Sequence, residues 1–137
     1  MKKILAVVLD DANGMMYNNR RQSRDRLLIQ DLADSFTSEI LIAPYSEQLF
    51  KDFAHRIKVS DSPLADCPDG GVCFIEDPRL IPSIDCVDTI VIYRWLKLYP
   101  NDLSLPFSIE DSGFTLAQEY EFVGSSHDKI WKGIYRR

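Results

Sequence analysis

The sequence has few of the residues that build a disulfide framework or a metal site. Its 137 residues include three irregularly spaced cysteines and two histidines. An odd, irregular set of cysteines does not suit a secreted disulfide scaffold. Without a Cys-x-x-Cys pair or clustered histidines, a zinc ion would have no ligand set. We therefore expect no metal, and we interpret the cysteines as small core or loop residues.

Basic charge is also scarce, and no apolar run is long. Lys and Arg number 16 against 21 Asp and Glu, which gives a net charge of −5. This balance argues against a nucleic-acid partner, because such proteins need a basic footprint to replace counterions. The longest apolar run, Ile4–Leu9, is too short to span a bilayer, and Asp10 and Asp11 end it without a signal-peptide cleavage site. We expect a cytoplasmic protein with no membrane partner.

Hydrophobic residues make up 45% of the chain, enough for the core of a single domain spanning residues 1–137. Strand-like runs alternate with helix-like stretches, which predicts a three-layer α/β domain with a mostly parallel central sheet. The expected strands are Lys3–Leu9, Glu39–Ala43, Arg56–Val59, Val72–Ile75 and Thr89–Trp95, followed by an antiparallel hairpin of Phe114–Phe122 and Lys129–Tyr135.

The segments between these strands carry helix and loop signals. Residues 10–22 contain Asn13-Gly14 and two further asparagines, so they are expected to form a loop. Ser23 is a suitable N-cap for the next helix, with Asp25 in its first turn. The buried face of that helix is expected at Leu27, Leu28, Leu32 and Phe36, a second helix at Tyr45–Phe53, and another loop at residues 60–71.

One segment resembles a known family. Tyr93-Arg-Trp-Leu-Lys-Leu-Tyr-Pro-Asn-Asp-Leu-Ser-Leu-Pro106 follows the strand Thr89–Ile92. It is similar to the part of dihydrofolate reductases where a central strand ends and a Gly-Asp-Thr-x-Phe-Pro turn leads into the last hairpin. Residues 5–15, 39–50 and 114–137 resemble the reductase's first strand and mobile loop, its next strand and cofactor-side helix, and its final hairpin. The resemblance implies a trimmed dihydrofolate-reductase-like fold.

The cofactor motifs of that family are altered here. Where the reductases have Gly-Arg-x-Thr after the second strand, this chain has Ala43-Pro44-Tyr45-Ser46, without the Arg and with one backbone donor removed. Where consecutive glycines open a phosphate-binding helix, Val72–Ile75 continues into Glu76 and Asp77. Two carboxylates would repel a pyrophosphate. We therefore expect no cofactor, and no standard use of NADPH.

A second resemblance concerns Asn19-Arg-Arg-Gln-Ser-Arg-Asp25 and Gly124-Ser-Ser-His127. Both are similar to patterns in a small bacterial family, some members of which carry a ribonuclease Z label. That activity requires a His-x-His-x-Asp-His metal cluster, which two isolated histidines do not supply. The residues therefore give the ribonuclease hypothesis no support.

The main candidate site is the arginine-rich segment before the first helix. Arginines at a helix N-terminus suit a small anion, because free amides and planar guanidinium groups both favour phosphate or carboxylate. The alternative is a solvated helix start whose arginines pair with Asp10, Asp11, Asp31 or Asp34. The predicted ligand-binding residues are Asn19, Arg20, Arg21, Gln22 and Arg24.

The reductase resemblance places Asp25 near the family's substrate-binding acid and Tyr93 at a supporting strand position. Together they would form a catalytic pair that faces one cleft, binds a protonated heterocycle or acts as acid and base. The alternative is that Asp25 only stabilises the helix start. Ser125, Ser126, His127 and Asp128 suggest a Ser–His–Asp site only weakly, because triad members come from separated segments; a polar hairpin loop is the simpler interpretation.

These features favour a protein that binds, and in one version turns over, a small anionic or heterocyclic ligand between residues 10–25 and the strand carrying Tyr93. The competing hypothesis is a non-catalytic interaction module that lost its cofactor site and forms a homodimer. Its contact face would use aromatic side chains, which are common interface anchors. The candidates are Phe107, Phe114, Tyr120, Phe122, Trp131 and Tyr135.

Overall fold

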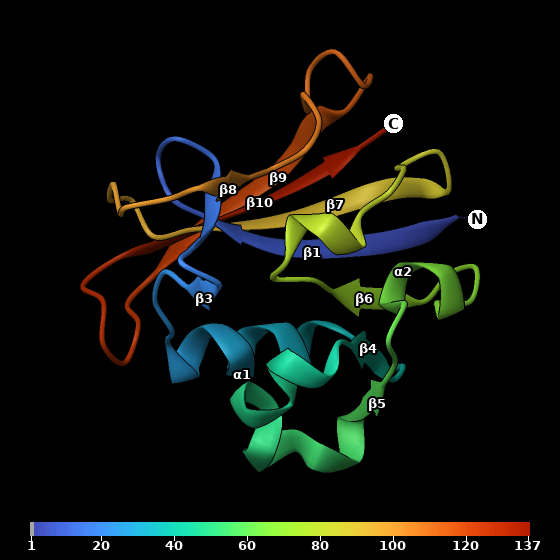
Figure 1. Ribbon diagram of the computed structural model, residues 1–137, viewed down its shortest axis with the longest axis horizontal. Helices are drawn as coiled ribbons and strands as arrows, with labels where there is room; N and C mark the ends of the chain where they lie inside the picture. Colours follow the sequence, from blue (N-terminus) through green and yellow to red (C-terminus); the bar gives the residue numbers. More distant parts are fainter. Residues whose placement is uncertain (1) are drawn as a thin grey trace.

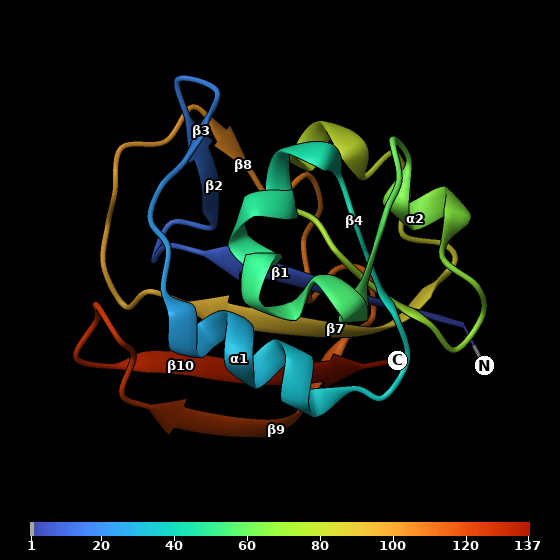
Figure 2. The ribbon, with the colours of Figure 1, turned by 90° about the horizontal axis from the view of Figure 1, so that it is seen from below.

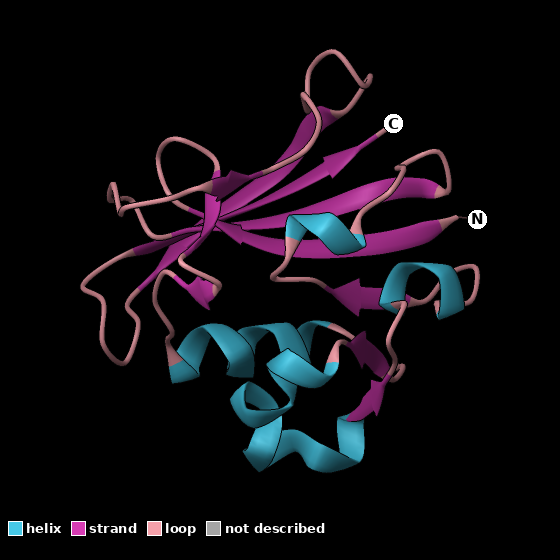
Figure 3. Ribbon diagram, viewed as in Figure 1, coloured by secondary structure: helices cyan, strands magenta, loops and turns pink. Residues whose placement is uncertain are grey.

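The structure is a computed structural model that describes residues 2–137, and a single twisted sheet dominates it (Figures 1 and 3). Within these residues the sheet has seven strands in the order β5-β4-β6-β1-β7-β10-β9. The strands from β5 to β7 are parallel, while β10 and β9 are antiparallel at one edge. Their bounds are β1 Lys3–Leu9, β4 Ile40–Ile42, β5 Ile57–Val59, β6 Val72–Phe74, β7 Val87–Arg94, β9 Thr115–Phe122 and β10 Ile130–Arg136.

The sheet separates two hydrophobic cores. Successive strand residues point to opposite faces, so Leu5 and Val7 of β1 join one core and Ala6 joins the other. Strand β7 alternates in the same way. Because the central strands are buried on both faces, they need the continuous apolar runs seen in the sequence. The α/β class, the mostly parallel sheet and the C-terminal hairpin are thus confirmed.

Helices cover both faces of the sheet. On one face lie α1 (Arg26–Ser35) and the irregular 3₁₀ segment η1 (Pro44–Arg56), whose Leu28 and Phe50 join the same core. Figure 2 shows α1 lying across β7 and β10. The other core contains Leu64 of α2 (Pro63–Asp66), and the partly buried Leu80 of η2 (Pro78–Leu80) packs against it. A small sheet, in the order β3-β2-β8, adds Met15 and its neighbours to that core.

The prediction of a loop over residues 10–22 is wrong. This segment contains β2 (Gly14–Tyr17) and β3 (Arg20–Arg21), which pair antiparallel, and β2 also pairs with β8 (Leu103–Ser104). Asn18 and Asn19 form the two-residue turn with φ of 52° and 60°. A two-residue hairpin turn of this left-handed kind favours asparagine or glycine. The asparagines therefore mark a hairpin turn.

Smaller corrections concern helix ends and burial. Asp25, and not Ser23, is the N-cap of α1, because its backbone is extended and its carboxylate accepts from the N–H groups of Leu27 and Leu28. Leu27 is 38% exposed, so it does not belong to the buried face. The helix expected at 45–53 is the longer η1, and the loop expected at 60–71 contains α2.

Candidate functional site

A cleft opens at the carboxyl ends of β6, β1 and β7, beside the first turn of α1. About 390 Å³ of space lies between its walls when open solvent is included, and about 20 Å³ of this is cavity with room for water. We call it the main cleft. Apolar side chains form most of its lining, and the polar segment preceding α1 together with Glu76 forms the rest. The lining residues are Val8, Met15, Arg21, Gln22, Ser23, Arg24, Asp25, Leu28, Ile29, Leu49, Phe74, Glu76 and Trp95.

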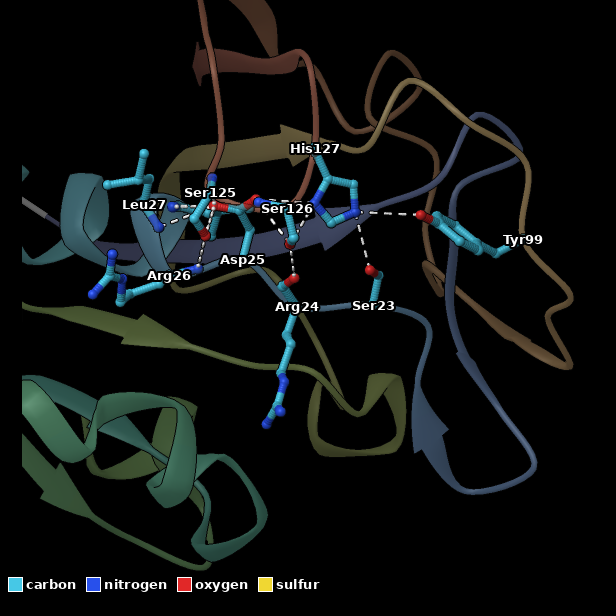
Figure 4. Close-up of polar contacts among 10 residues, drawn as sticks. Ser23, Arg24, Asp25, Arg26, Leu27, Tyr99, Ser125, Ser126 and His127 are labelled. Atoms are coloured by element: carbon cyan, nitrogen blue, oxygen red, sulfur yellow. Dashed lines mark hydrogen bonds and ion pairs between the residues drawn. The ribbon is translucent and has the colours of Figure 1, made fainter.

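Asp25 is the centre of a buried hydrogen-bond network (Figure 4). Its side chain is 0% exposed. One carboxylate oxygen accepts from the backbone N–H of Ser125 at 2.9 Å, and the other accepts from the N–H of Ser126 at 2.9 Å. Burial alone would raise the pKa of Asp25, but these amide donors, His127 and the Ser125 hydroxyl outweigh it and lower the pKa. The carboxylate is therefore ionised and can only accept hydrogen bonds.

His127 connects Asp25 to Ser23. Its Nδ1 lies 3.0 Å from the Asp25 carboxylate, and its Nε2 lies 3.0 Å from the Ser23 hydroxyl and 3.3 Å from that of Tyr99. Because the carboxylate accepts only, Nδ1 carries the proton of a neutral ring and Nε2 is left as the acceptor. Trp95 stacks on the imidazole with ring centroids 4.3 Å apart. The ring is thus held on two edges and one face.

Arg21 forms a two-point ion pair with Glu76. The guanidinium donates at 2.8 and 3.1 Å to the two carboxylate oxygens, and it lies over the ring of Tyr45. Ser46 also donates to Glu76, at 2.7 Å. The pair therefore ties β3 to the segments that follow β4 and β6. Arg21 thus pairs with Glu76 and with none of the four acids that the sequence suggested, which were Asp10, Asp11, Asp31 and Asp34.

Gln22 has a buried acceptor without a partner. Its amide nitrogen donates to Asp10 at 2.9 Å and to the carbonyl of Pro100 at 3.3 Å, which fixes the orientation of the amide. Its carbonyl oxygen is buried and forms no hydrogen bond within residues 2–137. Asp10 is fully buried; desolvation raises its pKa, but hydrogen bonds led by the N–H groups of Gly14 and Ala12 lower the pKa overall. The Gln22 oxygen is covered by protein atoms, so it is an unsatisfied buried acceptor that a ligand in the main cleft does not contact.

The predicted contact between Asp25 and Tyr93 is not formed. The Tyr93 hydroxyl donates to Asp31 at 2.6 Å, and Lys132 donates to the same carboxylate at 2.8 Å. Burial and the Asp31 charge raise the pKa of Tyr93. Tyr93 also does not line the main cleft. Asp25 and Tyr93 therefore belong to separate hydrogen-bond networks: Asp25 bonds to His127, and Tyr93 bonds to Asp31.

The other predicted ligand-binding residues separate into two places. Arg24 lies at the rim of the main cleft and is exposed, and its guanidinium forms no bond or ion pair within the described chain. Arg20 lies instead in a second hollow beside Tyr99 and Pro100. Asn19 accepts from Arg79 at 3.3 Å. Of the predicted arginines, Arg24 is therefore the one that combines a place in the main cleft with a free guanidinium.

Sequence reasoning missed the roles of Ser23 and His127. Ser23 was interpreted as a helix cap, and His127 as part of a polar hairpin loop. The one available signal was the Gly124-Ser-Ser-His127 pattern, which lies about a hundred residues from Asp25. Within residues 2–137 no three His, Cys, Asp or Glu side chains are grouped to share a metal ion. In that range no helix has the length and apolar character to cross a membrane.

Comparison with solved structures found the dihydrofolate reductase of Enterococcus faecalis, determined with NADP(H) and RAB-propyl. The match has a TM-score of 0.67 and covers 99% of this chain and 96% of the reductase, at 11% sequence identity. No protein-family description matches the sequence, and no curated protein does. At this identity the likeness establishes the fold: the chain has a dihydrofolate-reductase-like architecture, as the sequence resemblance implied.

Proposed function

We propose that this domain binds a small anionic or heterocyclic ligand in the main cleft. The position of the cleft supports this, because open α/β sheets bind ligands at the carboxyl ends of their parallel strands. Its composition does so too: an apolar lining with a few polar groups is typical of small-molecule sites. The observation that carries the proposal is the free guanidinium of Arg24 at the rim of this cleft.

Arg24 supplies the positive charge for an anionic group. Arg21, which lines the same cleft, is already neutralised by Glu76. Arg24 has no such partner in the described residues, so it can form two parallel hydrogen bonds with a carboxylate or phosphate. Figure 4 shows its side chain extending away from Asp25 and His127. An anion would therefore bind at the rim, away from the Asp25 carboxylate.

The apolar lining of the main cleft sets the rest of the ligand. We expect a small ligand with an apolar part that packs against this lining and one anionic group that pairs with Arg24. Asp25 would not contact it directly, because the protein already supplies hydrogen bonds to both of its carboxylate oxygens.

The residues do not fit the NADP(H) of the reductase. The helical segment after β4 begins with Pro44, which has no N–H to donate. The turn after β6 is capped by Asp77, whose carboxylate already accepts from the N–H of Arg79. Between them lies the carboxylate of Glu76, paired to Arg21. One amide donor is thus missing and two carboxylates would repel a pyrophosphate at the ends of these strands, so we derive no step through this cofactor.

A thermal-shift panel with the pure protein tests the proposal. It includes NADPH, dihydrofolate, methotrexate, pterins, nucleotides and sugar phosphates. A ligand at about 100 times its dissociation constant adds about 2.7 kcal/mol to the free energy of unfolding, so we expect a shift of several degrees with an anionic heterocycle. Arg24→Ala should then weaken binding roughly 10- to 150-fold, because a charged hydrogen bond contributes about 1.5–3 kcal/mol.

Arg20→Ala is the matched control, since Arg20 is an exposed arginine of the same segment outside the main cleft. It should leave the affinity unchanged. If Arg20→Ala weakened binding and Arg24→Ala did not, the ligand site would lie in the second hollow. A shift with NADPH that survives Arg24→Ala would contradict the proposal.

The second candidate function is the homodimeric interaction module. The observation that favours it is the surface of the edge strand β9, where Leu116 and Tyr120 are 40% and 50% exposed, and Val123 directly after it is 70% exposed. A row of apolar side chains on an unpaired edge is suited to another chain. No thermal shift in the panel, together with a dimer mass in sedimentation equilibrium, would favour the module over the binding proposal.

A further inference from the structure

We propose that Ser23 is a nucleophile, activated by His127 and Asp25, and that the main cleft hydrolyses a small ester bearing an anionic group. This inference rests on the proposed ligand site and adds a reaction to it. Its basis is the continuous array Ser23 Oγ–His127 Nε2 and His127 Nδ1–Asp25 Oδ2, with both separations 3.0 Å (Figure 4).

The geometry meets the requirements of a Ser–His–Asp relay. The hydroxyl must lie within hydrogen-bond reach of a base, and the base must be oriented by a third group. Ser23 and Asp25 come from the segment before α1, whereas His127 comes from the loop between β9 and β10. The ionised carboxylate fixes the proton on Nδ1, so Nε2 can accept the Ser23 proton.

Ser23 differs from the other serines around Asp25. The hydroxyl of Ser125 donates to Asp25, and that of Ser126 donates to the carbonyl of Arg24. Ser23 has His127 as its one partner in the described residues, is only partly buried, and lines the main cleft next to Arg24. It is therefore the hydroxyl that a ligand in the cleft can reach.

The surroundings also suit the charge changes of acyl transfer. When His127 becomes an imidazolium, the buried Asp25 carboxylate stabilises it, and Trp95 keeps water from one face of the ring. The backbone N–H of Arg24 forms no hydrogen bond within residues 2–137. Because it directly follows the nucleophile in the chain, it is a candidate donor to a developing oxyanion. The Arg24 guanidinium would hold the anionic group of the ester.

The reaction balances with water as the second substrate. As Ser23 Oγ bonds to the ester carbonyl carbon, its proton passes to Nε2 of His127. The bond from that carbon to the alcohol oxygen then breaks, and the alcohol leaves with the proton from His127. Water next attacks the acyl carbon and gives one proton to His127. The bond to Oγ breaks, Ser23 regains the proton, and the carboxylic acid is released.

A serine-directed fluorophosphonate tests the nucleophile directly, with intact-mass spectrometry as the readout. We expect one adduct on the wild-type protein, mapped to Ser23 by peptide analysis. Ser23→Ala should abolish the adduct, and His127→Gln should slow its formation roughly 10²-fold or more, which is the usual contribution of a general base. Ser104→Ala is the control, because Ser104 is exposed and lies in β8. Melting curves confirm that each variant is folded.

The outcomes separate this inference from the proposed ligand site. A folded wild-type protein that remains unlabelled overturns the nucleophile, and so does an adduct that persists in Ser23→Ala. If a ligand binds through Arg24 while Ser23 is never labelled, the binding proposal stands and the reaction falls. If Ser23 is labelled and a ligand from the panel slows the labelling, both stand. If Ser23 is labelled but no ligand in the panel raises the melting temperature, the nucleophile is supported and small anionic heterocycles are disfavoured as ligands.

Discussion

Asp25→Ala is expected to lower the free energy of unfolding by about 3–5 kcal/mol, the usual effect of removing one member of a buried charged network. The substitution removes the N-cap of α1, an effect of about 0.5–2 kcal/mol on its own. It also leaves the N–H groups of Ser125 and Ser126 and the Nδ1–H of His127 without their acceptor. Urea unfolding monitored by circular dichroism measures the change.

Asp34→Ala is the matched control, because Asp34 is an exposed acid on the same helix. Its effect should stay within about 0.5 kcal/mol, as for most surface substitutions. The loss of unfolding free energy in Asp25→Asn should lie between those of Asp25→Ala and Asp34→Ala, because the amide of Asn retains one acceptor for the helix cap. An Asp25→Ala protein within about 1 kcal/mol of the wild type would show that the network contributes far less than a buried carboxylate should.

Acid should destabilise the wild-type protein more steeply than Asp25→Asn. The folded-state pKa of Asp25 lies below the ordinary value of 3.8, as does that of Asp10. Below about pH 5 the unfolded chain therefore binds protons that the folded chain does not, and stability falls as the pH falls. Asp25→Asn removes one of these two groups. Melting temperatures measured from pH 7 to pH 3 should decline less steeply in the variant, and equal slopes would contradict the assignment.

The parts of the fold that follow from local pattern were accessible from the sequence. The runs in β1 and β7 are apolar on both faces, so they could only be central strands, and the segment from Thr89 to Pro106 pointed to the reductase-like architecture. The β2–β3 hairpin was missed because Asn18-Asn19 was weighed as a loop signal and not as a two-residue turn. This error was local, and it left the predicted fold class unaffected.

The site was less accessible, because its contacts are set by tertiary packing. An arginine cluster is visible in the sequence, but the choice of Glu76 as the partner of Arg21 depends on how β3 lies relative to the segment that follows β6. Likewise, His127 meets Asp25 only because the β9–β10 hairpin closes over the start of α1. No periodicity connects two residues about a hundred positions apart. Residue types that carry chemistry could be identified, whereas their pairing required the structure.

Gly124→Ala is expected to disrupt the same network by steric conflict and to destabilise the protein by about 1–3 kcal/mol, the usual effect of overpacking. A Cβ at this position would lie 2.3 Å from an Asp25 carboxylate oxygen and 2.8 Å from Ile130. Val123→Ala, at a neighbouring exposed residue, is the control and should change little. Because the closest conflict is with the carboxylate, adding Gly124→Ala to Asp25→Ala should be less harmful than adding it to the wild type. A double-mutant cycle measures that difference, and simple additivity would mean that Gly124 is required for another reason.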